Sequence, residues 1–130
     1  METPLLTVTR VSCRPTPGSG DGARWQATWV LRNAGTSPLT LEAAWIPHGR
    51  FRGDGRLPLS GQIGPGATRE VEFSVTAEGA AGTVVENAFL ILRVRLERAA
   101  RRVFVRMRIE FDSAAVPEPV VETITTQCLE

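Results

Sequence analysis

Residues 86–111 decide the fold; they read ENAFLILRVRLERAARRVFVRMRIEF and hold seven of the fifteen arginines. On a helix, these apolar and charged side chains would mix around the circumference and no apolar stripe would form. On a strand they separate, because successive side chains point to opposite faces of a sheet. One face is then apolar in both halves of the stretch: Ala88, Leu90, Leu92, Val94 and Leu96, then Val103, Val105, Met107, Ile109 and Phe111.

The two halves predict a long antiparallel hairpin that folds about Ala99 and Ala100. In this register Leu92 pairs with Met107 inside, while Arg93 faces Arg106 outside. The other predicted pairs are Leu96 with Val103, Val94 with Val105, Leu90 with Ile109, Arg95 with Phe104, Glu97 with Arg102 and Ile91 with Arg108. A slip of one residue would carry every apolar side chain to the outer face, so the assignment of faces is strongly constrained.

Shorter stretches elsewhere show the same alternation. One apolar face is expected from Trp25, Ala27, Trp29 and Leu31, another from Leu39, Leu41, Ala43 and Trp45, and a third from Val71, Phe73 and Val75. Weaker strand candidates are residues 5–13 and 57–63. Glycine and proline mark the turns between the strands, and no stretch carries helix caps. The pattern predicts an all-β fold, an antiparallel β-sandwich of about seven to eight strands over residues 1–111.

Two of these stretches resemble a known family. Residues 28–42, TWVLRNAGTSPLTLE, and residues 62–76, QIGPGATREVEFSVT, are similar to elements of bacterial immunoglobulin-like and fibronectin-like modules of the CARDB kind. The likeness covers roughly residues 5–111 and implies an immunoglobulin-like sandwich. Most members of the family are non-catalytic spacers, surface modules and accessory domains that contact proteins or glycans. The chain lacks paired core cysteines and has no tyrosine, so an antibody-like role is not implied.

Composition and charge narrow the classes of function. The 130 residues carry fifteen basic side chains, all arginine, against fourteen acidic ones, for a net charge of +1. A nucleic-acid binder usually has a larger basic excess, so we expect no nucleic-acid partner. No apolar run is long enough to span a bilayer, so we expect no membrane insertion. The N-terminus has no signal-peptide pattern, which predicts a cytoplasmic protein if the chain is complete; an extracytoplasmic location stays open if it is part of a longer protein.

The residues that could act as metal ligands or nucleophiles do not predict an active site. Cys13 and Cys128 lie near opposite ends of the chain, and His48 is the only histidine. No metal-ligand spacing and no grouping of a nucleophile with a base is present, so we expect neither a cofactor nor a catalytic function. Two free thiols are favoured over a disulfide, because disulfides are rare in reducing compartments.

The arginine-rich face of the hairpin is the first candidate contact surface, carried by Arg93, Arg95, Arg106 and Arg108. Forked guanidinium groups could bind a carboxylate, a phosphate or an acidic glycan. The alternative is a solvated face whose positive charge is neutralised by Glu42, Glu97 and Glu110. This alternative is favoured, because the exposed face of an antiparallel sheet usually carries polar and charged side chains.

The loop of residues 47–56 is the second candidate, with Arg50, Phe51 and Arg52 as partner contacts. Its Arg-Gly-Asp tripeptide at residues 52–54 matches a cell-adhesion motif but is too short to indicate that function. The preference of glycine and aspartate for turns explains its presence. The three tryptophans are expected in the core because they lie on the apolar faces of their strands. Trp25, next to a glycine-rich loop, is the one expected to be most exposed.

The C-terminal extension, residues 112–130, predicts one further edge strand. Pro117 and Pro119 should lie at its start, since proline cannot donate a ladder hydrogen bond. The strand itself is expected from Val120 to Thr126, with Val120 and Ile124 buried and Glu122 near a basic side chain. Pairing within the chain gives a monomer and pairing with another chain gives a strand-exchanged dimer; the first is favoured.

These observations predict a non-catalytic protein-interaction or accessory module of bacterial origin. The alternative is a glycan-binding module that uses exposed tryptophan and arginine side chains.

Overall fold

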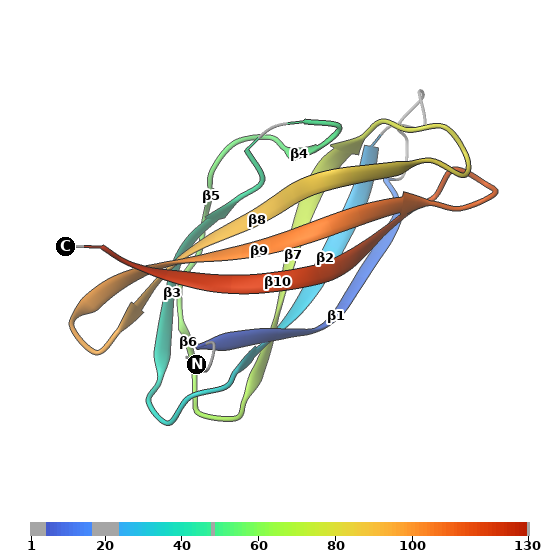
Figure 1. Cartoon of the computed structure of the whole chain (residues 1–130). Coiled ribbons are helices and arrows are strands. Elements are labelled where there is room, and N and C mark those ends of the chain that lie inside the picture. The colour runs from blue at the N-terminus through green and yellow to red at the C-terminus, as the bar shows by residue number, and fades with distance from the viewer. Residues whose placement is uncertain (1–4, 17–23, 48, 130) are drawn as a thin grey trace.

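Two antiparallel sheets pack face to face as a β-sandwich in the computed structural model, which describes residues 5–16, 24–47 and 49–129 (Figure 1). Ten strands make up the described part, against the seven to eight expected. The longer strands are β1 (Leu6–Pro15), β2 (Arg24–Asn33), β3 (Leu39–Trp45), β7 (Thr68–Ala77), β8 (Val84–Leu96), β9 (Ala99–Phe111) and β10 (Pro117–Leu129). The short ones are β4 (Phe51–Gly53), β5 (Leu57–Pro58) and β6 (Gln62–Ile63).

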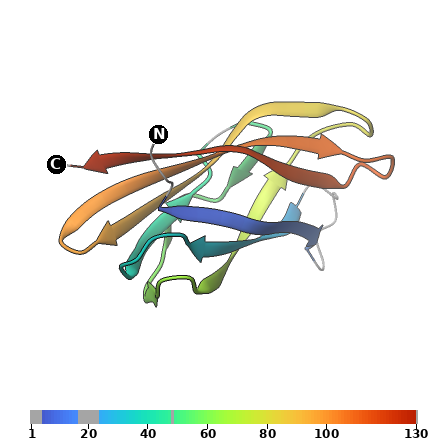
Figure 2. The same ribbon diagram turned by 60° about the horizontal axis from the view of Figure 1, so that its bottom comes forward.

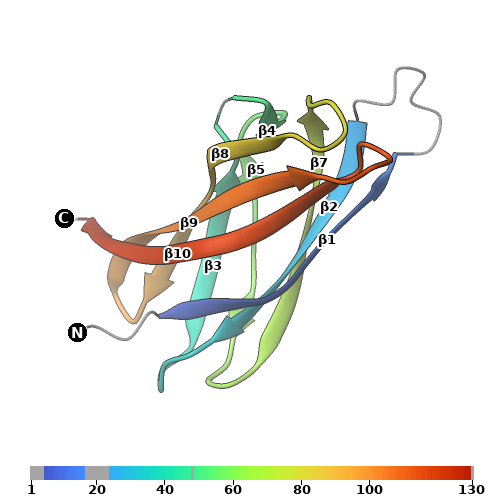
Figure 3. The same cartoon turned by 45° about the vertical axis from the view of Figure 1, so that its right-hand side comes forward.

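The smaller sheet has the strand order β1-β2-β7-β4 and the larger one β10-β9-β8-β3-β5, with β6 also paired to β3. The edge strands β1 and β10 of the two sheets lie close together (Figure 2). Figure 3 shows β8, β9 and β10 running side by side over the other sheet. The larger sheet therefore presents one broad outer face, and this face carries the candidate site described below.

The inner faces of both sheets meet in one apolar core. Trp29 is fully buried near its centre and makes edge-to-face contacts with Phe51 (6.3 Å between ring centroids) and Phe73 (5.6 Å). Trp25 is also buried, with 8% of its surface exposed, so the expectation that it is the most exposed tryptophan is wrong. Phe51, expected as a partner contact, is buried because β4 pairs with β7 and turns this ring inward.

Asn33 is the buried polar residue that fixes the turn from β2 to β3. Its amide nitrogen donates to the backbone oxygens of Ser37 (2.8 Å) and Ile63 (2.9 Å), and its Oδ1 accepts from the N–H of Gly35 (2.9 Å). A buried side-chain amide is stable when its donors and acceptor are satisfied in this way. The contacts join the Asn-Ala-Gly turn to β6 and so set where β3 begins.

The β8–β9 hairpin has the predicted faces but not the predicted register. Leu92 pairs with Val103 in place of Met107, and the turn lies at Glu97 and Arg98 rather than at the two alanines. The tighter turn brings Ala99, Ala100 and Arg101 into the ladder, where they pair with Leu96, Arg95 and Val94. The register differs by an even number of residues, so the side chains predicted for the inner face still point inward.

Strand β3 departs from simple alternation because it contains a β-bulge. Leu41 pairs with Val94, but the next pair along is Ala43 with Arg93, which leaves Glu42 as the extra residue. After the bulge the inward positions change, and Ala44 and Ile46 lie in the core. Trp45, predicted for the core, is half-buried on the outer face of the larger sheet. The alternation expected for residues 39–46 is therefore wrong beyond Leu41.

The C-terminal segment forms β10, which pairs with β9 over its whole length, from Pro117 to Leu129. The turn before it is held by Asp112, whose Oδ1 accepts from the N–H groups of Ala114 (2.8 Å) and Val116 (2.9 Å). Such a turn directs the chain back along β9.

A second bulge, at Glu122, again changes which residues of β10 point inward. Val121 and Ile124 pack against the core, whereas Val120 lies opposite Arg108, so the predicted burial of Val120 is wrong. Glu122 contacts a basic side chain as expected, with its Oε2 3.2 Å from Nη1 of Arg108.

Substitutions on the two faces of the hairpin should differ sharply in effect. Leu92→Arg puts an unpartnered charge where no side-chain surface is exposed, and should lower the free energy of unfolding by at least about 3 kcal/mol. Arg106→Leu removes only an exposed ion pair with Glu122 (3.9 Å) and should change it by less than about 1 kcal/mol. Urea unfolding of both variants measures the difference. Equal losses would contradict the assignment of faces.

Removal of β10 should weaken the fold without changing the oligomeric state. A chain that ends at residue 115 uncovers the edge of β9 and loses the apolar contacts of Val121 and Ile124. We expect a loss of about 3 kcal/mol and a fall in Tm of about 10 °C, with a monomeric mass before and after truncation. Light scattering and a thermal melt test this. A mass that halves on truncation would indicate strand exchange, and an unchanged Tm would show that β10 does not contribute to the fold.

Candidate functional site

An apolar row crosses the outer face of the larger sheet. Trp45 on β3 pairs with Ile91 on β8, which pairs with Phe104 on β9. Directly paired residues of an antiparallel sheet point to the same side and touch. All three are half-buried, and Phe89 adds an edge-to-face contact with Phe104 (6.5 Å between centroids). We call Trp45, Ile91 and Phe104 the apolar row.

Arginines border the apolar row on both sides. Arg93 lies opposite Arg102 on one side, and Arg106 lies opposite Phe89 on the other. The predicted pairs of Arg93 with Arg106, and of Arg102 with Glu97, are therefore wrong. Directly opposed like charges destabilise a sheet by about 0.2–1 kcal/mol. The observed turn thus places Arg93 opposite Arg102, where the predicted hairpin would have placed it opposite Arg106.

Glu42 reduces this repulsion, and the bulge gives it the position to do so. Its Oε1 lies 3.1 Å from Nε of Arg93 and its Oε2 lies 3.3 Å from Nε of Arg95. Glu42 therefore neutralises part of the face, as the sequence suggested. Glu97, also expected to contribute, instead accepts a weak hydrogen bond from the hydroxyl of Ser37 (3.5 Å).

Trp45 holds two further guanidinium groups. The Cζ atom of Arg56 lies 4.4 Å from the centroid of the indole ring, and that of Arg102 lies 5.8 Å from it. Each cation–π contact of this kind contributes about 0.5–1 kcal/mol at an exposed site. The Nε atom of Arg102 is buried and has no hydrogen-bond acceptor among the described residues. We call Arg56, Arg93 and Arg102 the arginine cluster.

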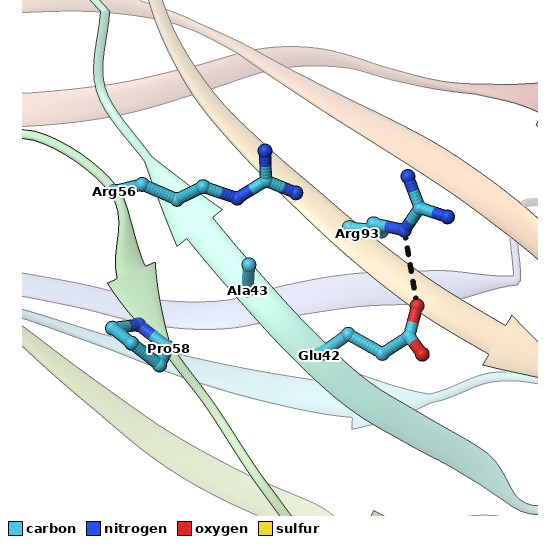
Figure 4. Close-up of a pocket in the computed structure, with 5 residues that line it drawn as sticks. All are labelled: Glu42, Ala43, Arg56, Pro58 and Arg93. Carbon is cyan, nitrogen blue, oxygen red and sulfur yellow. Dashed lines mark hydrogen bonds and ion pairs between the residues drawn. The ribbon is translucent and has the colours of Figure 1, made fainter.

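A shallow pocket of about 380 Å³ lies within this region, lined by Glu42, Ala43, Arg56, Pro58 and Arg93. Figure 4 shows Arg56 and Arg93 on opposite sides of Ala43, with the side chain of Arg56 directed toward the pocket and Glu42 bound to Nε of Arg93. The two terminal nitrogens of Arg93 point away from that carboxylate. The pocket thus offers charged donors above a floor of small apolar groups.

The other two arginines predicted for this face are paired. Nη1 of Arg108 lies 3.2 Å from Glu122 and its Nε lies 2.8 Å from Glu110, a hydrogen bond that raises the pKa of Arg108 above its ordinary value. Arg106 is 3.9 Å from Glu122. This end of the face is therefore a set of compensated surface ion pairs, in agreement with the solvated alternative.

The loop of residues 47–56 joins the site through Arg56, and not through the predicted contacts Arg50, Phe51 and Arg52. Arg52 donates to Gly49 O (3.0 Å) and to Glu78 (3.2 Å), while Arg50 is exposed, and His48 lies outside the described residues. Both oxygens of Asp54 accept hydrogen bonds from Arg24 (3.1 and 2.6 Å), which hold the pKa of Asp54 below its ordinary value. The acidic residue of the Arg-Gly-Asp tripeptide is thus already occupied.

Three residues of the site, namely Trp45, Arg56 and Arg102, were not singled out from the sequence as contacts. One signal was available, because Trp45 and Ile46 are adjacent and cannot both point inward from one strand. Only the bulge decides which of them lies outside. No pattern in the sequence predicts the contact of Arg56 with Trp45, because Arg56 comes from the turn between β4 and β5.

The described residues contain no group of three or more His, Cys, Asp or Glu side chains that could hold a metal ion. Both cysteines are free thiols: Cys128 is exposed on β10, and burial raises the pKa of Cys13 to about 12. A thiol with so high a pKa is almost entirely protonated near neutral pH and is a poor nucleophile.

The two thiols should therefore differ in reactivity at pH 8. The thiolate fraction of Cys13 falls as its pKa rises from 9.0 to about 12, so we expect it to react at least about ten times more slowly in the folded protein than after unfolding. An aromatic disulfide reagent followed by absorbance measures this, with Cys13→Ser as the control that leaves only Cys128. Rapid release equal to two thiols per folded chain would contradict the burial of Cys13.

Comparison of the chain with known protein families, with curated proteins and with solved structures finds no significant match. Among the described residues there is no helix with the length and apolar character needed to cross a membrane.

Proposed function

We propose that this protein is a non-catalytic interaction module and that a protein partner docks on the outer face of its larger sheet. One observation carries the proposal: the β3 bulge turns Trp45 out of the core, into a row with Ile91 and Phe104 bordered by arginines. Tryptophan, other aromatic residues and arginine are enriched at the energetically dominant positions of protein interfaces. The immunoglobulin-like character suggested by the sequence motifs, and a role as a bacterial accessory module, belong to the same proposal.

A glycan-binding function is the second candidate, because Trp45 is a half-exposed tryptophan with arginines beside it. Sugar rings bind by stacking on an open aromatic face, and here the guanidinium group of Arg56 lies 4.4 Å from the ring centroid. A sugar would have to displace that contact before it could stack. This cost favours a protein partner, whose side chains could bind beside Arg56 along the row.

A peptide-display selection tests the proposed function. Peptides selected on the wild-type chain should bind Trp45→Ala about 30-fold more weakly, the loss expected when a central interface residue is truncated. The matched control is Val30→Asn, because Val30 is half-buried on the outer face of the smaller sheet. Binding that is equal for wild type and Trp45→Ala, or lost equally in both variants, would contradict the proposal.

The same protein distinguishes the second candidate. A polysaccharide that stacks on Trp45 would change its fluorescence on titration, whereas the protein-docking proposal expects no change. A saturable change that is absent in Trp45→Ala would establish the glycan-binding function.

A further inference from the structure

We propose that the arginine cluster binds a carboxylate side chain of the partner, so that the partner contributes an acidic residue beside apolar ones. This inference rests on the proposed function, because it assigns the chemistry of the group that docks at one end of the apolar row. It concerns the pocket between Arg56 and Arg93 and the neighbouring Arg102.

The balance of charge around Trp45 is the first support. Four guanidinium groups, those of the cluster and of Arg95, share a single carboxylate, Glu42. Each oxygen of Glu42 already accepts from one Nε, at 3.1 Å from Arg93 and 3.3 Å from Arg95. Nη1 of Arg95 also donates to the backbone oxygen of Arg98 (3.3 Å), whereas the terminal nitrogens of Arg56, Arg93 and Arg102 contact no carboxylate among the described residues and can bind an incoming anion. By contrast, Arg108 at the other end of the face contacts two carboxylates.

The second support is an unsatisfied donor. Arg102 lies directly opposite Arg93, and its buried Nε has no acceptor among the described residues. Buried polar groups in native proteins are nearly always hydrogen-bonded, so one without a partner calls for a ligand, a water or a functional reason. A carboxylate bound on the outer face beside Arg93 and Arg102 would screen their repulsion.

The guanidinium groups are also held in place before any ligand arrives. The indole ring of Trp45 supports Arg56 and Arg102, and Glu42 fixes Arg93 through Nε, with its terminal nitrogens turned away from that carboxylate (Figure 4). A forked guanidinium binds a carboxylate through parallel N–H groups. Arginines positioned in advance lose less conformational entropy on binding.

The surroundings favour an acidic protein segment over a polyanion. Glu42 lines the pocket itself, and Glu110 and Glu122 lie on the same sheet. These carboxylates repel a phosphate chain, and the net charge of the protein is only +1. A single carboxylate avoids most of that repulsion, and Pro58, Ala43 and the apolar row can accept the carbon atoms next to it.

A pair of peptides that differ in one group tests the inference. Acetyl-Leu-Glu-Phe-amide and acetyl-Leu-Gln-Phe-amide are titrated into the ¹⁵N-labelled full chain, and the Nε–H signals of the arginines are followed by NMR. The Glu peptide should shift the signals of Arg56, Arg93 and Arg102 and bind at least about fivefold more tightly than the Gln peptide. Equal binding of the two peptides would overturn the inference. Tighter binding of inorganic phosphate than of the Glu peptide would overturn the choice of a carboxylate.

Two variants and a control show which arginines bind the Glu peptide. Arg56→Met and Arg102→Met should each weaken binding of the Glu peptide about fivefold or more, while Arg14→Met, which removes an exposed partner of Glu72, should leave it unchanged. Arg102→Met removes an unsatisfied donor and the repulsion from Arg93 but also the contact with Trp45, so its Tm should stay within about 3 °C of the wild-type value. A larger fall in Tm would show that Arg102 is mainly structural and would contradict its place in the site.

The carboxylate site and the proposed docking face can be confirmed or overturned independently of each other. Display-selected peptides that need Trp45 but neither an acidic residue nor Arg56 would sustain the docking face and overturn the carboxylate site. Binding of the Glu peptide without any Trp45-dependent selected peptide would sustain the carboxylate site and overturn the docking face.

Discussion

One extra residue in β3 determines what the outer face of the larger sheet can do. Side chains alternate along a strand, so Leu39 and Leu41 should be followed inward by Ala43 and Trp45. The bulge at Glu42 shifts that alternation, and the core receives Ala44 and Ile46 instead. The indole ring, left on the outside, becomes the support for Arg56 and Arg102. Bulges are common where a strand must redirect a side chain for function, and this one leaves the carboxylate of Glu42 beside Arg93 and Arg95 and the ring of Trp45 beside Arg56 and Arg102.

The charges of that face divide it into two ends with different electrostatics. Near Glu122, arginines and carboxylates are matched, and surface ion pairs of this kind contribute little to stability. Near Trp45, the guanidinium groups outnumber the carboxylates, and two of them oppose each other across β8 and β9. This excess of positive charge is the feature on which the proposed carboxylate site rests.

Long strands with strict alternation were predictable in part. The faces of β8 and β9 follow from their side chains alone, and a register that differs by an even number of residues leaves them unchanged. The cross-strand partner of each residue could not be predicted in this way, because the two hairpins that the sequence allows differ only in where the chain turns. The chain turns at Glu97 and Arg98, and this turn brings Arg93 opposite Arg102. The position of the turn, which the alternation of side chains does not report, decided that contact.

The sequence by itself determined that this is an all-β protein with an apolar interior and an arginine-rich outer face. It did so because the period of two is a local property that each strand carries along its own length. It also indicated that Glu42 would lie near the arginines and Glu122 near a basic side chain. Only the tertiary structure decided that Trp45 lies outside, that Phe51 lies inside, and that Arg56 contacts the indole ring. Bulges and short strands such as β4 are set by the fit between two packed sheets, and that fit depends on residues far apart in the chain.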